Sequence, residues 1–230
     1  MSALLSVSDV VASLGTQRVL DGVSLRVPPG TWQVITGHSG SGKSTLAALL
    51  IGLYRPSAGS LLVGGSSPAD WDPAELRRSI GYAGQEPVLV HGTLRENIAF
   101  ADAPASDGMI AAVVEACCLA PLVRSLPRGM ATHVGERGYT LSGGEKSRVA
   151  VARALLHDPA VLILDEVNTM LDAATEQALW DNLLRLRASR TTIVITHHSE
   201  SVPGGAEALE LRGGVIAGTE ARRLAGAGAR

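Results

Sequence analysis

The chain contains the stretch Trp32-Gln33-Val34-Ile35-Thr36-Gly37-His38-Ser39-Gly40-Ser41-Gly42-Lys43-Ser44-Thr45, and this stretch decides its fold. The first five residues predict a strand, and the apolar run from Leu46 to Leu53 behind them predicts a helix. The part between fits the pattern of a glycine, four residues, then glycine, lysine and a hydroxyl residue. A strand, a glycine-rich loop and a helix in this order predict a phosphate-binding loop.

The residue types in this loop suit the binding of a triphosphate. The backbone amides can wrap the β-phosphate, Lys43 can reach the β and γ oxygens, and the Ser44 hydroxyl can bind Mg²⁺. The predicted nucleotide contacts are Gly37, Ser39, Gly40, Ser41, Gly42, Lys43, Ser44 and Thr45. The alternative of a coincidental glycine-rich turn is disfavoured, because the loop joins a predicted strand to a predicted helix.

An acidic pair stands at the end of a second predicted strand. The run from Val161 to Leu164 is continuously apolar, as in a buried parallel strand, and Asp165 and Glu166 follow it directly. Open α/β sheets bind ligands at this end of their strands. Asp165 would hold Mg²⁺ through water, and Glu166 would polarise the attacking water. Alone, such a pair can be an ordinary helix cap; beside a phosphate loop it is more specific.

A second candidate anion site lies between these two features, at Leu141-Ser142-Gly143-Gly144-Glu145. Two glycines behind a serine at the start of a predicted helix expose bare backbone N–H groups, which attract anions. Since the chain already has one phosphate loop, this second site suggests that another molecule supplies the other half of the pocket.

Together these motifs resemble the ATP-binding cassette (ABC) family, whose signature sequence is LSGGQ. Glu145 stands here where the family has Gln. The resemblance extends from about Leu5 to Leu224, and it implies ATP and Mg²⁺ as cofactors. It also implies that Ser142, Gly143 and Gly144 cover the ATP of a partner cassette.

The resemblance assigns roles to further residues. Gln85 matches the glutamine that senses the γ-phosphate and Mg²⁺ and connects to a helical lobe, so the implied Mg²⁺ residues are Ser44, Gln85 and Asp165. His197 matches the histidine that bridges the γ-phosphate and the catalytic Glu166. Asp172 matches the aspartate of the D-loop. Glu166 and His197 are therefore the candidate catalytic pair.

The expected fold class is α/β. The resemblance implies a P-loop NTPase (RecA-like) core with a mixed sheet, an N-terminal antiparallel β lobe and an inserted α-helical lobe. A length of 230 residues suits one such domain over residues 1–230, with the helical lobe at about 86–157. A closing hairpin of Ala208 to Leu211 with Val215 to Ala217 is expected around Gly213-Gly214.

Two segments are similar to exporter-type cassettes, in which they touch the coupling helices of a membrane domain. They are Gly92 to Ile98 after Gln85, and Thr132 to Gly138 before the signature. The implied partners are a second nucleotide-binding domain, identical or not, and a transmembrane permease domain, fused or separate. The implied location is the cytoplasmic face of the cell membrane. The formal net charge of −2 shows no excess of basic residues of the kind that binds nucleic acid, so nucleic acid is not expected as a partner.

Two departures from the family pattern keep other functions open. Leu14 stands where exporter cassettes usually carry a Tyr that stacks on adenine, which predicts weak nucleotide selectivity. Met170 stands where small residues are common before Leu171 and Asp172. Both departures would fit a regulatory nucleotide-binding subunit that barely hydrolyses ATP. A soluble ABC ATPase without a membrane partner is the other alternative, although the exporter-like segments favour a transporter.

Overall fold

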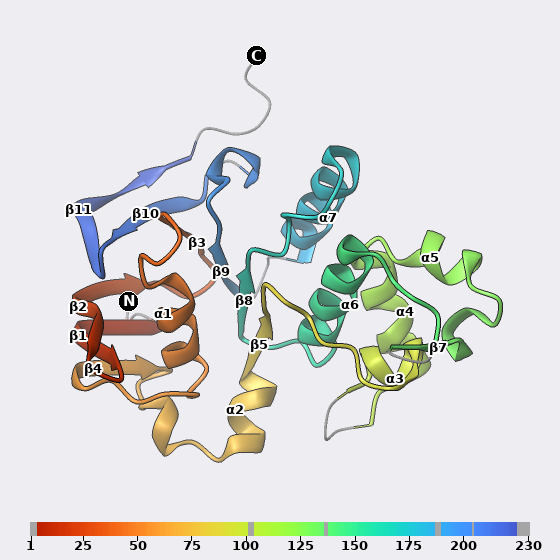
Figure 1. Cartoon of the computed structure of the whole chain (residues 1–230), viewed down its shortest axis with the longest axis horizontal. Coiled ribbons are helices and arrows are strands. Elements are labelled where there is room, and N and C mark those ends of the chain that lie inside the picture. The colour runs from red at the N-terminus through yellow and green to blue at the C-terminus, as the bar shows by residue number, and fades with distance from the viewer. Residues whose placement is uncertain (1–3, 101–103, 136–137, 187–189, 204, 225–230) are drawn as a thin grey trace.

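The computed structural model of the chain describes residues 4–100, 104–135, 138–186, 190–203 and 205–224. Its centre is a six-stranded sheet in the order β11-β10-β3-β9-β8-β5 (Figure 1). The strands are β3 (Trp32–Thr36), β5 (Ile80–Ala83), β8 (Val161–Asp165), β9 (Thr191–Ile195), β10 (Glu207–Arg212) and β11 (Val215–Arg223). Neighbouring strands are parallel except β10 and β11, so the sheet is mixed, as predicted.

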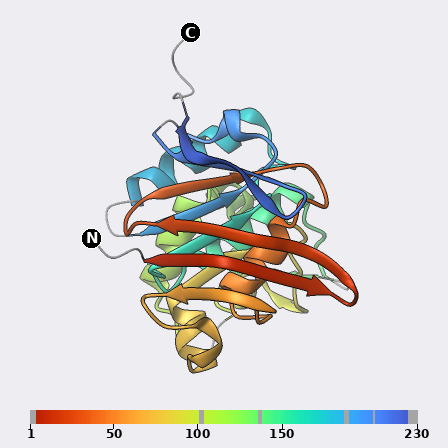
Figure 2. The ribbon, with the colours of Figure 1, turned by 90° about the vertical axis from the view of Figure 1, so that its left-hand side faces the viewer.

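An antiparallel sheet in the order β2-β1-β4 forms the N-terminal lobe. Figure 2 looks onto its strands, which cross in front of the central sheet. They are β1 (Leu5–Leu14), β2 (Gln17–Val27) and β4 (Ala58–Val63). The buried side chains of this lobe share one apolar cluster with helix α1 (Lys43–Leu50) and with one face of the central sheet. The antiparallel lobe therefore covers that face.

The alternation of side chains along the central strands feeds two separate cores. In β8, Val161 and Ile163 belong to the cluster under the antiparallel lobe, whereas Leu162 and Leu164 belong to a second cluster on the opposite face. Successive strand residues point to opposite faces, so a strand covered on both faces is continuously apolar. This burial explains why the run before Asp165 contains no polar residue.

Helices cover the second face of the sheet and form the lobe opposite the antiparallel strands (Figure 1). Helix α6 packs against β5, and the Trp180 ring of α7 meets Trp32 edge-on at 6.1 Å between centroids. The lobe's remaining helices bury apolar residues in the same cluster as α6. These helices are α3 (Leu94–Ile98), α4 (Asp107–Ala116), α5 (Ala120–Ser125), α6 (Gly143–Leu155) and α7 (Ala173–Arg185). Helix α2 (Pro73–Ser79) differs, because its buried Leu76 belongs to the cluster under the antiparallel lobe.

Short elements complete the described part of the chain. A two-stranded ladder pairs β6 (Gly92–Thr93) with β7 (His133–Val134), which lie in the two segments that resemble exporter cassettes. Within the described ranges, 3₁₀ turns occur at Pro68–Asp70, Gly129–Ala131 and Ser199–Ser201. Glu136 and Arg137 of the second exporter-like segment lie outside the described residues. No helix in the described ranges combines the length and apolar character needed to cross a bilayer.

Some element boundaries differ from those predicted. Helix α1 begins at Lys43 rather than Leu46 and ends at Leu50, because Gly42 (φ 105°) starts it and Gly52 (φ 73°) turns the chain away behind it. Helix α2 was not predicted, although its start is marked by Asp72, whose carboxylate accepts bonds from two backbone N–H groups of the first turn. The last strand, β11, runs beyond Ala217 to Arg223.

Candidate nucleotide-binding site

The phosphate loop joins β3 to α1, as predicted. Gly37 has φ 152°, and a Cβ atom there would collide with the carbonyl oxygen of Leu211. Gly42 has φ 105°, and its Cβ position lies 2.6 Å from a methyl group of Leu20. Only glycine combines these backbone angles with such close neighbours. The loop backbone is thus shaped by packing against β10 and β2.

Lys43 is held across the loop that precedes it. Its side chain is 6% exposed, and Nζ donates hydrogen bonds to the carbonyl oxygens of Gly37 at 2.7 Å and His38 at 3.1 Å. The same Nζ lies 3.9 Å from Oε1 of Glu166. The ammonium group therefore lies between the phosphate loop and the acidic end of β8. A phosphate bound there would need a positive charge beside it, and Lys43 would supply that charge.

Three predicted site residues converge on Glu166. Nε2 of Gln85 donates a hydrogen bond to Oε2 at 3.0 Å, Nδ1 of His197 lies 3.4 Å from Oε1, and Nζ of Lys43 lies 3.9 Å from Oε1. Glu166 has φ 53°, a left-handed conformation that costs a non-glycine residue about 1 kcal/mol or more. Its N–H donates to the carbonyl of Ile195 at 2.9 Å, which fixes this backbone against β9.

Asp165 is buried at the end of β8. Burial raises the pKa of this carboxyl group, and the charge of Glu166 raises it further. Hydrogen bonds from Tyr82 and Ser44 and the charge of Lys43 lower the pKa, but the net shift is upward. The Tyr82 hydroxyl donates to Oδ2 at 3.3 Å, and burial beside Asp165 raises the pKa of Tyr82 to about 12. A cation nearby would favour the ionised carboxylate.

The donor set fits Mg²⁺. Oδ1 of Asp165 and Oγ of Ser41 are buried and have no hydrogen-bond partner within the described residues. Ser44 and Asp165 offer the hard oxygen ligands that Mg²⁺ prefers, and Mg²⁺ is commonly bound by one or two protein groups together with phosphates and water. In the described part of the chain, no group of three or more His, Cys, Asp or Glu side chains could hold a metal by itself.

A cavity of about 810 Å³ opens beside these groups. It is large enough for a nucleotide, since small-molecule pockets measure roughly 300–1,000 Å³. Leu14, which ends β1 and is 50% exposed, is one of the residues that line it. The predicted site residues that line the cavity are Ser39, Gly40, Gly42, Lys43, Ser44, Thr45, Gln85, Glu166 and His197. Gly37 and Ser41 shape the loop behind this lining.

The signature segment lies at the start of α6, as predicted. Ser142 is the N-cap: its hydroxyl accepts from the N–H of Glu145 at 3.3 Å, and the Glu145 carboxylate accepts from the N–H of Ser142 at 2.7 Å. Glutamate and glutamine both serve in this reciprocal capping box, which accounts for the Glu at this position. Leu141 is buried in the helical core.

The two signature glycines are packed against the segment between β8 and α7. A Cβ atom on Gly143 would collide with Sδ of Met170, and one on Gly144 would lie 2.6 Å from the carbonyl oxygen of Met170. The cavity beside the phosphate loop is lined by no residue of 141–145 among those described. Within one chain the signature and the phosphate loop therefore remain separate.

Asp172 is the N-cap of α7. Its carboxylate accepts hydrogen bonds from the N–H of Thr175 at 3.0 Å and from the Thr175 hydroxyl at 2.7 Å, and these bonds hold the pKa of Asp172 below its usual value. Its predicted D-loop role between two cassettes stays a prediction. Tyr82 was missed as a site residue, because its contact with Asp165 joins two strands that are distant in sequence.

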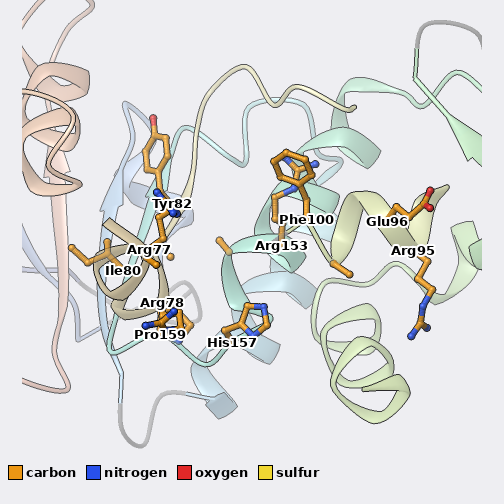
Figure 3. A pocket seen from close by; sticks show the side chains of 14 residues that line it. Arg77, Arg78, Ile80, Tyr82, Arg95, Glu96, Phe100, Arg153, His157 and Pro159 are labelled. Carbon is orange, nitrogen blue, oxygen red and sulfur yellow. The ribbon is translucent and has the colours of Figure 1, made fainter. Parts of the chain in front are cut away.

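A second hollow, of about 610 Å³, lies between α2 with β5 on one side and α3 with α6 on the other. Figure 3 shows Ile80, Arg78 and Tyr82 on one wall and Phe100 with Arg153 facing them. The guanidinium of Arg153 lies 5.1 Å from the centre of the Phe100 ring. The lining includes four arginines, Arg77, Arg78, Arg95 and Arg153, and one glutamate, Glu96. We call this hollow the arginine groove.

Comparisons with known proteins agree with this geometry. The family model described as "ABC transporter" matches residues 20–169. Antigen peptide transporter 2 of Mus musculus is 40% identical over 85% of this chain and 28% of its own length. The mycobactin import ATP-binding/permease protein IrtB of Mycobacterium tuberculosis is 43% identical over 82% of this chain and 32% of its own length.

A solved structure, that of a bacterial Atm1-family ABC exporter with ATP bound, superposes with a TM-score of 0.88 at 35% identity, over 94% of this chain and 38% of that one. This match confirms the α/β cassette fold expected from the sequence. The chain spans less than a third of the length of the two curated relatives named above. With the phosphate loop, the acidic strand end and the signature in the family's order, the chain belongs to the ABC transporter family.

Proposed function

We propose that this chain is the ATP-hydrolysing nucleotide-binding domain of an exporter-type ABC transporter. The observation that carries the proposal is the convergence of Lys43, Gln85 and His197 on the Glu166 carboxylate beside a cavity of nucleotide size. We further propose that residues 1–230 form one domain, in which the helical lobe spans about 86–157.

In the proposed reaction, Glu166 accepts the proton of the water that attacks the γ-phosphate, and His197 holds that carboxylate in place. Lys43 neutralises the phosphate oxygens, which requires its Nζ to exchange a backbone carbonyl for the ligand. Gln85 moves with the helical lobe and adjusts the Glu166 carboxylate. Bound Mg²⁺ would supply charge neutralisation at the β and γ oxygens, held by Ser44 and Asp165 and sensed by Gln85.

We propose that two nucleotide-binding domains pair head to tail around ATP. The support is the separation of the signature from the phosphate loop within one chain, where no residue of 141–145 lines the cavity among those described; the start of α6 would therefore have to serve the ATP of another molecule. Ser142, Gly143 and Gly144 would then offer N–H groups to the γ-phosphate held by the partner. Hydrolysis splits ATP into ADP and inorganic phosphate, and release of that phosphate would remove the group that both halves bind and let them separate.

We also propose that a transmembrane permease domain docks in the arginine groove, and that the chain thereby acts at the cytoplasmic face of a membrane. The groove combines the apolar Phe100 ring with a set of arginines; Arg95 lies within the exporter-like segment Gly92 to Ile98, and Phe100 follows that segment by two residues. A helix end that presents acidic and apolar side chains would complement this lining. Membrane co-purification would separate this function from a soluble ABC ATPase.

The test is Glu166→Gln in the full chain, with Glu200→Gln as a matched control at an exposed carboxylate that does not line the cavity. Loss of the general base is expected to lower the turnover of ATP by roughly 10²- to 10⁴-fold while ATP still binds. The variant is also expected to accumulate as an ATP-dependent pair. Unchanged steady-state hydrolysis in Glu166→Gln would refute the role of Glu166.

A weakly hydrolysing regulatory subunit is the second candidate. Two observations favour it: Leu14 leaves the base end of the cavity without an aromatic ring, and Met170 covers the signature glycine Gly143. Binding and turnover measured on the same preparation separate the two functions. Tight ATP binding with negligible hydrolysis, in the presence of a permease partner, would support the regulatory subunit.

A further inference from the structure

Tyr82 connects two parts of the site that the sequence motifs treat separately. Its hydroxyl donates to Oδ2 of Asp165 at 3.3 Å. Its ring folds back over Gly84, where an added Cβ atom would lie 2.9 Å from the Tyr82 hydroxyl. Gly84 directly precedes Gln85, whose amide reaches Glu166. One side chain thus touches the proposed Mg²⁺ ligand and the backbone next to the sensing glutamine.

The fold explains how Tyr82 reaches this position. β5 and β8 are parallel neighbours, and Tyr82 stands opposite Ile163, two residues before Asp165. The tyrosine side chain is long enough to extend past the end of β8. Figure 3 shows the Tyr82 hydroxyl directed away from Arg78 and Pro159 at the other end of the arginine groove. The ring itself forms part of the groove wall.

The two oxygens of Asp165 therefore have different surroundings. Oδ2 accepts the tyrosine hydrogen bond, whereas Oδ1 is buried without a hydrogen-bond partner within the described residues. A carboxylate that is fixed through one oxygen presents the other in a defined direction, as outer-shell groups commonly do for metal ligands. A phenylalanine would fill the same space, so packing alone does not call for the hydroxyl.

We propose that Tyr82 is a positioning residue that holds Asp165 so that Oδ1 faces the metal in the ATP-bound state. The proposal rests on the proposed function, because it assumes that Asp165 takes part in holding Mg²⁺. It adds a residue outside the phosphate loop, the acidic strand end and the signature. Tyr82 would then belong both to the metal site and to the wall of the arginine groove.

The main test is Tyr82→Phe in the full chain, with Mn²⁺ as a spectroscopic substitute for Mg²⁺. Mn²⁺ affinity is measured by electron paramagnetic resonance in the presence of ATP, and ATP affinity is measured separately in chelator. Removal of an outer-shell partner is expected to weaken Mn²⁺ binding about 10-fold, the lower end of the usual effect. ATP affinity without metal is expected to stay within about twofold, since the hydroxyl donates its hydrogen bond to Asp165, whose proposed role is to hold the metal.

Two further variants separate the possible outcomes. Asp165→Asn should weaken Mn²⁺ binding more strongly than Tyr82→Phe does. If Asp165→Asn binds Mn²⁺ as tightly as the natural chain, Asp165 does not hold the metal, and both the metal assignment and the proposal for Tyr82 are overturned. If Asp165→Asn loses Mn²⁺ while Tyr82→Phe binds it as tightly as the natural chain, only the positioning role of Tyr82 is overturned. Tyr54→Phe, at an exposed tyrosine elsewhere, is the matched control.

Gly84→Ala provides an independent perturbation of the same hydrogen bond. The new methyl group would push the Tyr82 hydroxyl away from Asp165, since the Cβ position lies 2.9 Å from that oxygen. We expect Gly84→Ala to reproduce the loss of Mn²⁺ affinity in the natural background and to add little to it in Tyr82→Phe. If the losses of Mn²⁺ affinity in the two single variants add fully in the double variant, Gly84→Ala does not act through the Tyr82 hydroxyl, and the proposal is contradicted.

Discussion

Leu14→Tyr is expected to restore a base contact that this cassette lacks. Leu14 ends β1, is 50% exposed and lines the nucleotide cavity, opposite Gln17 across the β1–β2 turn. Because the Leu14 side chain is half exposed and lines the cavity, we expect a tyrosine ring at this position to reach the base of a bound nucleotide. Stacking of a base on an aromatic side chain is worth ~1–3 kcal/mol. Since about 1.4 kcal/mol changes an affinity tenfold, the variant should bind ATP roughly 5- to 150-fold more tightly.

The assay is a titration of ATP and of GTP against the natural chain and against Leu14→Tyr, with hydrolysis prevented by a chelator. The natural chain is expected to bind the two nucleotides with comparable affinity, because the described residues that line the cavity include no Phe, Tyr or Trp on which adenine could stack. Leu53→Tyr, at a leucine that is 65% exposed outside the cavity, controls for the added hydrophobic surface. The reasoning is refuted if Leu14→Tyr binds ATP no more tightly, or if the natural chain strongly prefers ATP.

Three other perturbations test the fold and the site. Glu96→Gln should lower stability at neutral pH, because hydrogen bonds from Thr93 at the start of α3 favour the ionised carboxylate and lower the pKa of Glu96 in the folded chain. That contribution is fully present above the pKa of the unfolded chain and is lost as the pH falls through the lowered pKa of the folded chain, so the effect of the substitution should shrink in acid; thermal unfolding at several pH values measures this. Trp180→Ala should cost ~3–5 kcal/mol in denaturant unfolding, since the ring is fully buried against Trp32. Met170→Ala should strengthen ATP-dependent pairing about fivefold by uncovering Gly143, if displacing the thioether costs ~1 kcal/mol; sedimentation would show this, and weaker pairing would contradict it.

The parts of the site that form from contiguous sequence could be predicted. The phosphate loop, the acidic end of β8 and the start of α6 each depend on local rules: glycine conformation, continuous apolar burial and helix capping. The parallel strands then place Gln85, Glu166 and His197 at one edge of the sheet. Gln85 and His197 both lie beside the Glu166 carboxylate, so the structure brings the three residues together, while their roles in a reaction stay predictions.

The parts that depend on contacts between distant segments could not be predicted. The bond from Tyr82 to Asp165 joins residues that are 83 positions apart, and no pattern around Tyr82 indicates it. The packing of Met170 on Gly143 brings together the segment after β8 and the start of α6. From the sequence, the bare glycines indicated an anion site; the structure adds that their small size is also required by a neighbouring segment of the same chain.

The arginine groove reaches both halves of the proposed ATP site through rigid elements. On one wall, Tyr82 connects it to Asp165. On the other, Arg153 lies near the C-terminal end of α6, where its guanidinium covers Phe100 and donates to the Asn97 carbonyl at 2.8 Å. The signature occupies the opposite end of this helix, about 16 Å from Arg153 along the helix axis.

A helix moves as a unit more readily than it bends. A partner that shifts α6 at the groove would therefore also shift Ser142 and the N–H groups offered to a second cassette. The same partner would also contact Tyr82, whose hydroxyl donates to Asp165. Docking in the groove and ATP binding are then coupled by two separate contacts, and removing either Tyr82 or Arg153 should weaken that coupling without abolishing it.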